Sequence, residues 1–186
     1  MSCSRICDTA NGYGVISRIL HWGMALLFTW QFTSASLRVL ANDTPIEKFF
    51  WSTHATVGVT LWLLVLVRGL WGVLNLSRRP KIEGPQYLVM VASATHLILY
   101  VLMVVVPTLA IMRSLGSGRG FTVYGLQIMA PGGEPHPALL APARALHGWL
   151  GWALLVLIIC HIAAALYHRV ILKDATLSRM LKGSSK

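Results

Sequence analysis

Four histidines lie inside long apolar stretches of the chain, where a side chain that can bind a metal is unusual. They are His21, His54, His147 and His161. The last two are 14 positions apart in one apolar run, which on a helix is almost four turns, so both imidazoles would share one face about 21 Å apart. An imidazole in hydrocarbon is costly unless it is bonded. The pattern therefore predicts two cofactors, each held between a pair of histidines, and haem fits it best.

The composition indicates which elements position these histidines. The 186 residues are 55% hydrophobic and only 12% charged, and the mean hydropathy is +0.64, which is typical of a membrane protein. Four runs reach the roughly 20 residues that span a bilayer: about 16–40, 50–76, 87–112 and 145–172. We expect an all-α membrane protein, a four-transmembrane-helix bundle. Its expected parts are an N-terminal cytoplasmic extension (1–15), a transmembrane domain (16–172) and a basic cytoplasmic tail (173–186).

The formal net charge of +10 resembles that of a nucleic-acid-binding protein, but its distribution indicates membrane topology instead. One set of flanks carries ten basic residues: Arg5, Arg18, Arg78, Arg79, Lys81, Arg169, Lys173, Arg179, Lys182 and Lys186. The opposite loops carry five: Arg38, Lys48, Arg113, Arg119 and Arg144. The positive-inside rule then places both termini in the cytoplasm. We expect a multi-pass protein of the bacterial inner membrane that binds lipid and no nucleic acid.

This topology pairs the histidines by depth. His21 is three residues after Arg18 and lies near the cytoplasmic face of the first helix. The second helix runs inward, which places His54 near the periplasmic face, and the fourth also runs inward, so His147 is outer and His161 is deep. The expected pairs are His54 with His147 and His21 with His161, and each bridges two helices, as a haem in a bundle core requires.

The residue four positions after each of these histidines is small: Ala25, Gly58, Gly151 and Ala165. A flat porphyrin needs such a surface one turn from its ligand, although small residues also serve ordinary helix packing in membranes. His96 is followed at the same spacing by the bulky Tyr100, which argues against His96 as an axial ligand. A hydrogen bond to a neighbouring helix and a role near a cofactor both stay open for His96.

The cysteines are less informative. Cys3 and Cys7 lie on the expected cytoplasmic side, where thiols stay reduced, and Cys160 lies within the fourth helix. A metal site at Cys3 and Cys7 is an alternative for which no further ligands lie nearby. The chain has no Cys-x-x-Cys-His, so haem would be held non-covalently.

Several charged residues are further candidates. Arg68 inside the second helix would meet a haem propionate or snorkel to the surface. His168 lies seven residues after His161 and is either an interfacial histidine or a proton-handling contact to a quinone. The long connection 113–144 contributes three arginines, and Lys48 is on the first connection. If Lys48, Arg113, Arg119 and Arg144 cluster above the outer cofactor, they would attract an anion such as superoxide; if not, they are a scattered solvated set.

From about Gly14 to Leu181 the chain resembles the prokaryotic cytochrome b561 family. The matching pieces are Arg18-x-x-His21-Trp22, His54 with Gly58, His96-x3-Tyr100, His147-x3-Gly151, His161-x6-His168 and Lys173-Asp174-x-Thr176-Leu177-x-Arg179-Met180. The resemblance implies a di-haem, quinone-linked membrane cytochrome in which the four paired histidines are the axial ligands and His168 contacts quinone. Arg169 stands where relatives often have a second histidine, and the Cys3/Cys7 extension is outside the pattern.

Three functions are compatible with these features. The first is an oxidoreductase of the superoxide:ubiquinone type: two b-type haems with both axial positions filled carry electrons from a periplasmic one-electron donor, with superoxide as a candidate, to ubiquinone positioned by His168, Lys173 and Asp174. The second is a cytochrome b anchor subunit that links a partner oxidoreductase to quinone. The third is a non-redox membrane protein, such as a metal transporter that uses intramembrane histidines.

Overall fold

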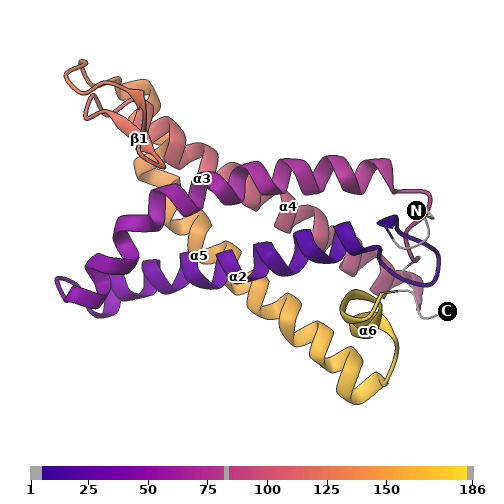
Figure 1. Ribbon diagram of the computed structural model, residues 1–186. Helices are drawn as coiled ribbons and strands as arrows, with labels where there is room; N and C mark the ends of the chain where they lie inside the picture. Colours follow the sequence, from indigo (N-terminus) through magenta and orange to yellow (C-terminus); the bar gives the residue numbers. More distant parts are fainter. Residues whose placement is uncertain (1–5, 82–83, 184–186) are drawn as a thin grey trace.

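Four long helices make up most of the protein (Figure 1). The computed structural model describes residues 6–81 and 84–183, so Cys3, Arg5 and Lys186 lie outside the described residues. The long helices are α2 (Val15–Leu40), α3 (Pro45–Leu74), α4 (Gln86–Leu115) and α5 (Pro137–Tyr167). The helix α5 continues as a π-helical turn, η1 (His168–Leu172), and a short helix α6 (Thr176–Leu181) follows.

Local sequence explains where two of these helices begin. The Thr44 side chain accepts a hydrogen bond from the Glu47 amide, and Pro45 occupies the first helical position of α3, where no hydrogen-bond donor is needed. The helix α5 likewise begins at a proline, Pro137. It therefore starts eight residues before the apolar run that the sequence analysis placed at 145–172, because a proline in the first turn begins a helix rather than breaking it.

Three of the described helical segments are long and apolar enough to cross a membrane: α3, α4 and the continuous segment Pro137–Leu172. The helix α2 has 26 residues, but Arg18, Gln31 and Arg38 make it more polar than the other three. The expected membrane protein is thus confirmed at the level of three candidate spans, whereas the fourth span and the side on which the termini lie stay predictions.

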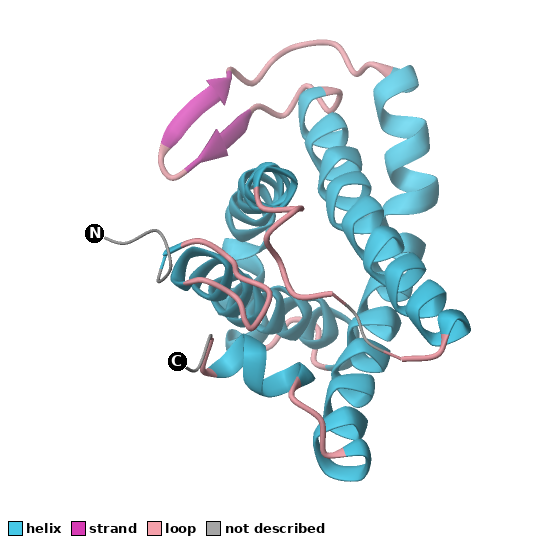
Figure 2. Ribbon diagram, turned by 90° about the vertical axis from the view of Figure 1, so that its right-hand side faces the viewer, coloured by secondary structure: helices cyan, strands magenta, loops and turns pink. Residues whose placement is uncertain are grey.

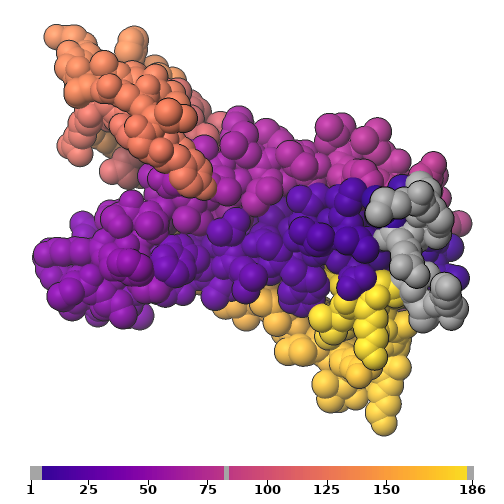
Figure 3. Space-filling view, viewed as in Figure 1, coloured from indigo at the N-terminus to yellow at the C-terminus, as the bar shows by residue number. Residues whose placement is uncertain are grey.

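The four helices share one core. Its buried residues come from all of them: Met24 from α2, Leu61 and Val65 from α3, Leu99 and Met103 from α4, and Leu154 from α5. The helix α2 packs on α3, and α4 packs on α5. The C-terminal half of α5 diverges from the other helices, and both ends of the chain lie at the same end of the molecule (Figures 1 and 3).

The long connection between α4 and α5 contains a two-stranded antiparallel hairpin, β1 (Phe121–Val123) and β2 (Leu126–Met129) (Figure 2). The hairpin lies at the opposite end of the molecule from α6 (Figure 1). Tyr124 and Gly125 form its turn, both with positive φ (51° and 79°), as a two-residue hairpin turn requires. The Tyr124 hydroxyl lies 2.6 Å from Thr60 Oγ1. This contact fixes the hairpin to α3.

Candidate functional site

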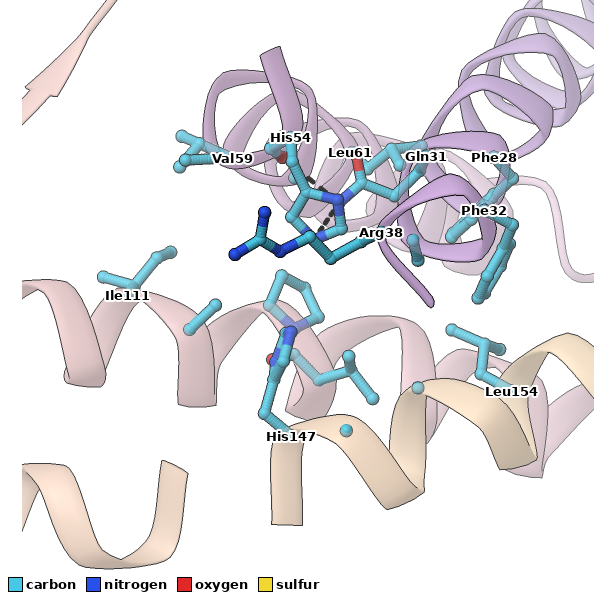
Figure 4. Close-up of a pocket in the computed structure, with 18 of the residues that line it drawn as sticks. Phe28, Gln31, Phe32, Arg38, His54, Val59, Leu61, Ile111, His147 and Leu154 are labelled. Atoms are coloured by element: carbon cyan, nitrogen blue, oxygen red, sulfur yellow. Dashed lines mark hydrogen bonds between the residues drawn. The ribbon is translucent and has the colours of Figure 1, made fainter. Parts of the chain in front are cut away.

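His54 from α3 and His147 from α5 face the same cavity, which has a volume of about 250 Å³ (Figure 4). Most of the lining is apolar and comes from all four long helices. Gly58 and Gly151, the small residues one turn after the two histidines, are part of it. The cavity thus presents two imidazoles in a mostly apolar lining. Because Gly58 and Gly151 have no side chains, the helix surface one turn from each imidazole stays open, which fits a flat apolar cofactor with a metal at its centre.

A hydrogen bond from another helix orients His147. Its Nδ1 lies 3.0 Å from the carbonyl oxygen of Val106 in α4. A carbonyl only accepts, so Nδ1 carries the proton and Nε2 keeps its lone pair. This is the tautomer that binds a metal through Nε2, and such a bond at the other ring nitrogen is usual for metal-ligating histidines.

The His54 ring is held in the same tautomer by two residues of α2. Ser34 Oγ lies 2.6 Å from Nδ1 and donates its own proton to the Gln31 carbonyl oxygen at 2.9 Å, so it accepts the Nδ1 proton. The Gln31 amide nitrogen lies 3.1 Å from both Nε2 and the His54 carbonyl oxygen and donates to them. Nε2 of His54 therefore has a lone pair, and a metal there would displace the Gln31 amide.

The second pair lies nearer the chain termini. The imidazole centroids of His21 in α2 and His161 in α5 are 6.4 Å apart, with an interplanar angle of 72°. Two imidazoles that bind one metal at about 2.0 Å each place their centroids roughly 6 Å apart. The Nδ1 atom of His21 is buried and has no hydrogen-bond partner among the described residues. The spacing of this pair fits a shared metal.

A third histidine, His96 in α4, also lies beside His161, with ring centroids 5.4 Å apart. Its Nδ1 lies 2.8 Å from the Ala92 carbonyl oxygen. The bulk of Tyr100 argues against His96 as an axial ligand, but the sequence leaves a role near a cofactor open for it, and the proximity to His161 favours that role. The Arg68 guanidinium lies 5.8 Å from the centroid of the Tyr100 ring. Tyr100 is one helical turn after His96 in α4, so Arg68 lies near this group of histidines.

At the end of α5, the chain turns back and brings His168 and Asp174 together. His168 Nδ1 lies 2.5 Å from Asp174 Oδ2, and the Thr176 amide donates to Asp174 Oδ1 at 2.8 Å. Lys173 makes the turn with a left-handed φ of 52°. Burial alone would raise the pKa of Asp174, but the hydrogen bonds from His168 and Thr176 outweigh it and hold the pKa below its usual value.

Three of the four basic residues expected above the outer cofactor are brought together. Arg113, Arg119 and Arg144 line a second cavity of about 210 Å³. Lys48 does not line it; its Nζ lies 3.8 Å from an Asp43 carboxylate oxygen. The three guanidiniums form a basic pocket at the hairpin end of the molecule.

Arg38, which was expected only as a charge of the first loop, is also part of the lining of the cavity that His54 and His147 face, which we call the outer cavity. Its Nη1 lies 2.9 Å from Oε1 of Glu47, which is fully buried. Its guanidinium also lies 5.2 Å from the centroid of the Trp51 ring, and Trp51 stacks on His54. Arg38 lines the same cavity as His54 and His147, and in the view of Figure 4 its side chain projects between them. The signal available in the sequence was an acidic residue, Glu47, nine positions after Arg38.

The family model described as prokaryotic cytochrome b561 matches residues 12–183. This chain belongs to the prokaryotic cytochrome b561 family. It is 31% identical to cytochrome b561 homolog 2 of Escherichia coli K12, over 96% of this chain and 95% of the relative. It is 26% identical to the probable superoxide oxidase CybB of Yersinia pestis (91% and 95%) and 29% identical to cytochrome b562 of Cereibacter sphaeroides (92% and 96%).

The resemblance drawn from the histidine motifs is therefore confirmed. Membership of the cytochrome b561 family implies haem b in a membrane protein and an activity as an oxidoreductase or electron carrier across the membrane. The apolar cavity and the histidine tautomers fit such a cofactor.

Proposed function

We propose that this cytochrome b561 carries electrons across the bacterial inner membrane between a periplasmic one-electron donor and ubiquinone at the cytoplasmic side. Superoxide is the candidate donor. Two b-type haems are bound non-covalently, one by His54 and His147 and the other by His21 and His161. The observation that carries this proposal is the existence of two imidazole pairs, one at a mostly apolar cavity and one with centroids 6.4 Å apart. A haem with two axial imidazoles supplies reversible one-electron exchange and leaves no iron position for oxygen chemistry.

The protein holds the two imidazoles of the outer cavity so that Nε2 of each has a lone pair for a metal in a mostly apolar surrounding. At the outer cavity this is done by hydrogen bonds to Nδ1 of His54 and His147 and by the apolar lining. Arg68, near the inner pair, is the candidate partner of a propionate. A guanidinium is suited to this because it binds carboxylates through two parallel hydrogen bonds.

The basic pocket of Arg113, Arg119 and Arg144 would raise the local concentration of an anionic donor, since superoxide carries one negative charge and three guanidiniums attract it. Lys48 would attract the anion less strongly, because the negative charge of Asp43 lies beside it.

At the cytoplasmic end, His168, Lys173 and Asp174 are the candidate quinone residues. Asp174 holds the Nδ1 side of His168, which leaves Nε2 to bind a quinone oxygen or transfer a proton to it. Two electrons from two donors and two protons from the cytoplasm make one quinol. Placement of both termini in the cytoplasm gives this end access to those protons.

To test this, purified, haem-loaded protein in lipid nanodiscs is mixed with superoxide and a soluble ubiquinone. The rate of quinol formation is then measured. His54→Ala should abolish the catalysed rate, and His136→Ala, a loop variant, should preserve it. If the wild-type rate does not exceed that of His54→Ala, superoxide is not the donor. If a soluble oxidoreductase co-purifies with the protein, and quinol forms only when that partner supplies the electrons, the chain is an anchor subunit instead.

A further inference from the structure

Ser34 is the one residue of α2 whose hydroxyl reaches a ring nitrogen of His54. It is completely buried, with 0% of its surface exposed, and its Oγ lies 2.6 Å from Nδ1. A hydroxyl in such a place must have a partner, since burying it unbonded is costly. Its proton goes to the Gln31 carbonyl oxygen at 2.9 Å, which leaves its oxygen free to accept.

The two bonds form a directed chain: the Nδ1–H of His54 donates to Ser34, and Ser34 donates to the Gln31 carbonyl. The direction has a chemical consequence. Because the hydroxyl can only accept from His54, Nδ1 must carry the ring proton, and the lone pair is placed on Nε2. The Gln31 amide supports the same tautomer by donating to Nε2, but a metal at Nε2 would displace it, and Ser34 would then be the side chain that still holds the Nδ1 proton.

His147, on the other side of the cavity, is oriented in another way. Its Nδ1 partner is the backbone carbonyl of Val106, which no side-chain substitution removes. Ser34 is therefore the point at which the ligand geometry of the outer cavity depends on a single side chain.

We propose that Ser34 is a positioning residue for the outer haem: its hydroxyl fixes the tautomer and ring plane of His54 and tunes the reduction potential of the iron bound there. This rests on the proposed function, in which His54 is an axial ligand. A hydrogen bond accepted from Nδ1–H makes the imidazole more basic, and a more basic ligand favours oxidised iron. Loss of the acceptor should therefore raise the potential.

The experiment is a spectroscopic redox titration of the purified, haem-loaded protein, combined with electron paramagnetic resonance of the oxidised form. Ser34→Ala should shift the potential of one haem to more positive values, change one low-spin signal and weaken haem retention at that site about ten- to a hundredfold. The other haem should not change. Ser34→Cys, which is similar in size and a weaker acceptor, should shift the same haem in the same direction by less, and it serves if the alanine variant does not fold.

Thr33→Ala is the matched control, because the Thr33 hydroxyl bonds the Thr29 carbonyl of its own helix at 2.8 Å. It should leave both potentials as in the wild type. Unchanged potentials and haem retention in both Ser34 variants would overturn the proposal, and so would an equal shift of both haems, which signals a general structural effect. Two haems retained in His54→Ala would instead overturn the proposed function itself.

Discussion

His21 and His161 are 140 positions apart in the chain, yet their imidazole centroids lie 6.4 Å apart. His96 is closer still to His161, at 5.4 Å, and approaches it edge-on at 77°. Three imidazoles therefore meet around one point of the bundle. Only two of them can be axial ligands of one haem, and the first prediction separates them.

His21→Ala and His161→Ala should each lower the haem content from two per chain to one, because each removes a proposed axial ligand of the inner site. His96→Ala should retain two haems. Haem is counted from the absorbance of its pyridine complex relative to protein. Loss of a haem in His96→Ala but not in His21→Ala would show that His96 is the ligand.

Filling the outer cavity should exclude the outer haem. A Cβ built on Gly151 has Val106 Cγ1 as its nearest neighbour at 4.0 Å, so Gly151→Ala should be accepted. Gly151→Leu would instead place a branched side chain in the space proposed for the porphyrin. We expect one haem per chain in the leucine variant and two in the alanine variant. Gly69→Leu is the control, since a Cβ at Gly69 meets no atom within 4 Å; if it loses haem equally, leucine acts by disturbing the helices.

Removing Arg38 should destabilise the protein, because Glu47 would remain as a buried carboxylate without its partner. The expected loss in Arg38→Ala is about 1–3 kcal/mol of unfolding free energy. The double variant Arg38→Ala/Glu47→Gln should lose less than the two single variants added together, since the neutral amide needs no counter-charge. Denaturant unfolding in detergent followed by circular dichroism measures this. Strict additivity would show that the ion pair is not coupled.

The carboxyl group of Asp174 should titrate below pH 3.8, its ordinary pKa. Its pKa is lowered in the folded protein, so the stabilisation from its contacts is complete above the ordinary pKa and is lost as the pH falls through the lowered one. Infrared difference spectra of the wild type minus Asp174→Asn give the midpoint. His168→Ala should move that midpoint upward. A wild-type midpoint at or above 3.8 would contradict the contact with His168.

The basic pocket should act through long-range charge. Arg119→Gln should lower the rate with superoxide at low ionic strength, and the difference from the wild type should shrink as salt is added, because salt screens exposed charges over about 10 Å at 0.1 M. Lys48→Gln should have a smaller effect. Lys81→Gln carries the same charge change at the opposite end of the protein and should have none. An equal effect of Lys81→Gln would indicate that only net charge matters.

The amino-acid sequence by itself determined the helices and the spacing of the histidines along them, because both depend only on residues close together in the chain. Apolar runs of sufficient length define helices in a membrane whatever their neighbours are, and three of the four expected spans have candidate helices in the described residues. Spacing along one helix is equally local, so His147 and His161 could be placed on one face without a structure. The family resemblance followed from these ordered motifs and is confirmed.

The tertiary structure decided which groups surround the histidines. The bond from His147 to Val106, the bond from His54 to Ser34, the pairing of Arg38 with Glu47 and the approach of His96 to His161 all join residues on different helices or across a turn. Such contacts depend on how each helix is rotated and at what angle it crosses the next. The packing of many side chains sets those angles, and no pattern within a single helix contains them.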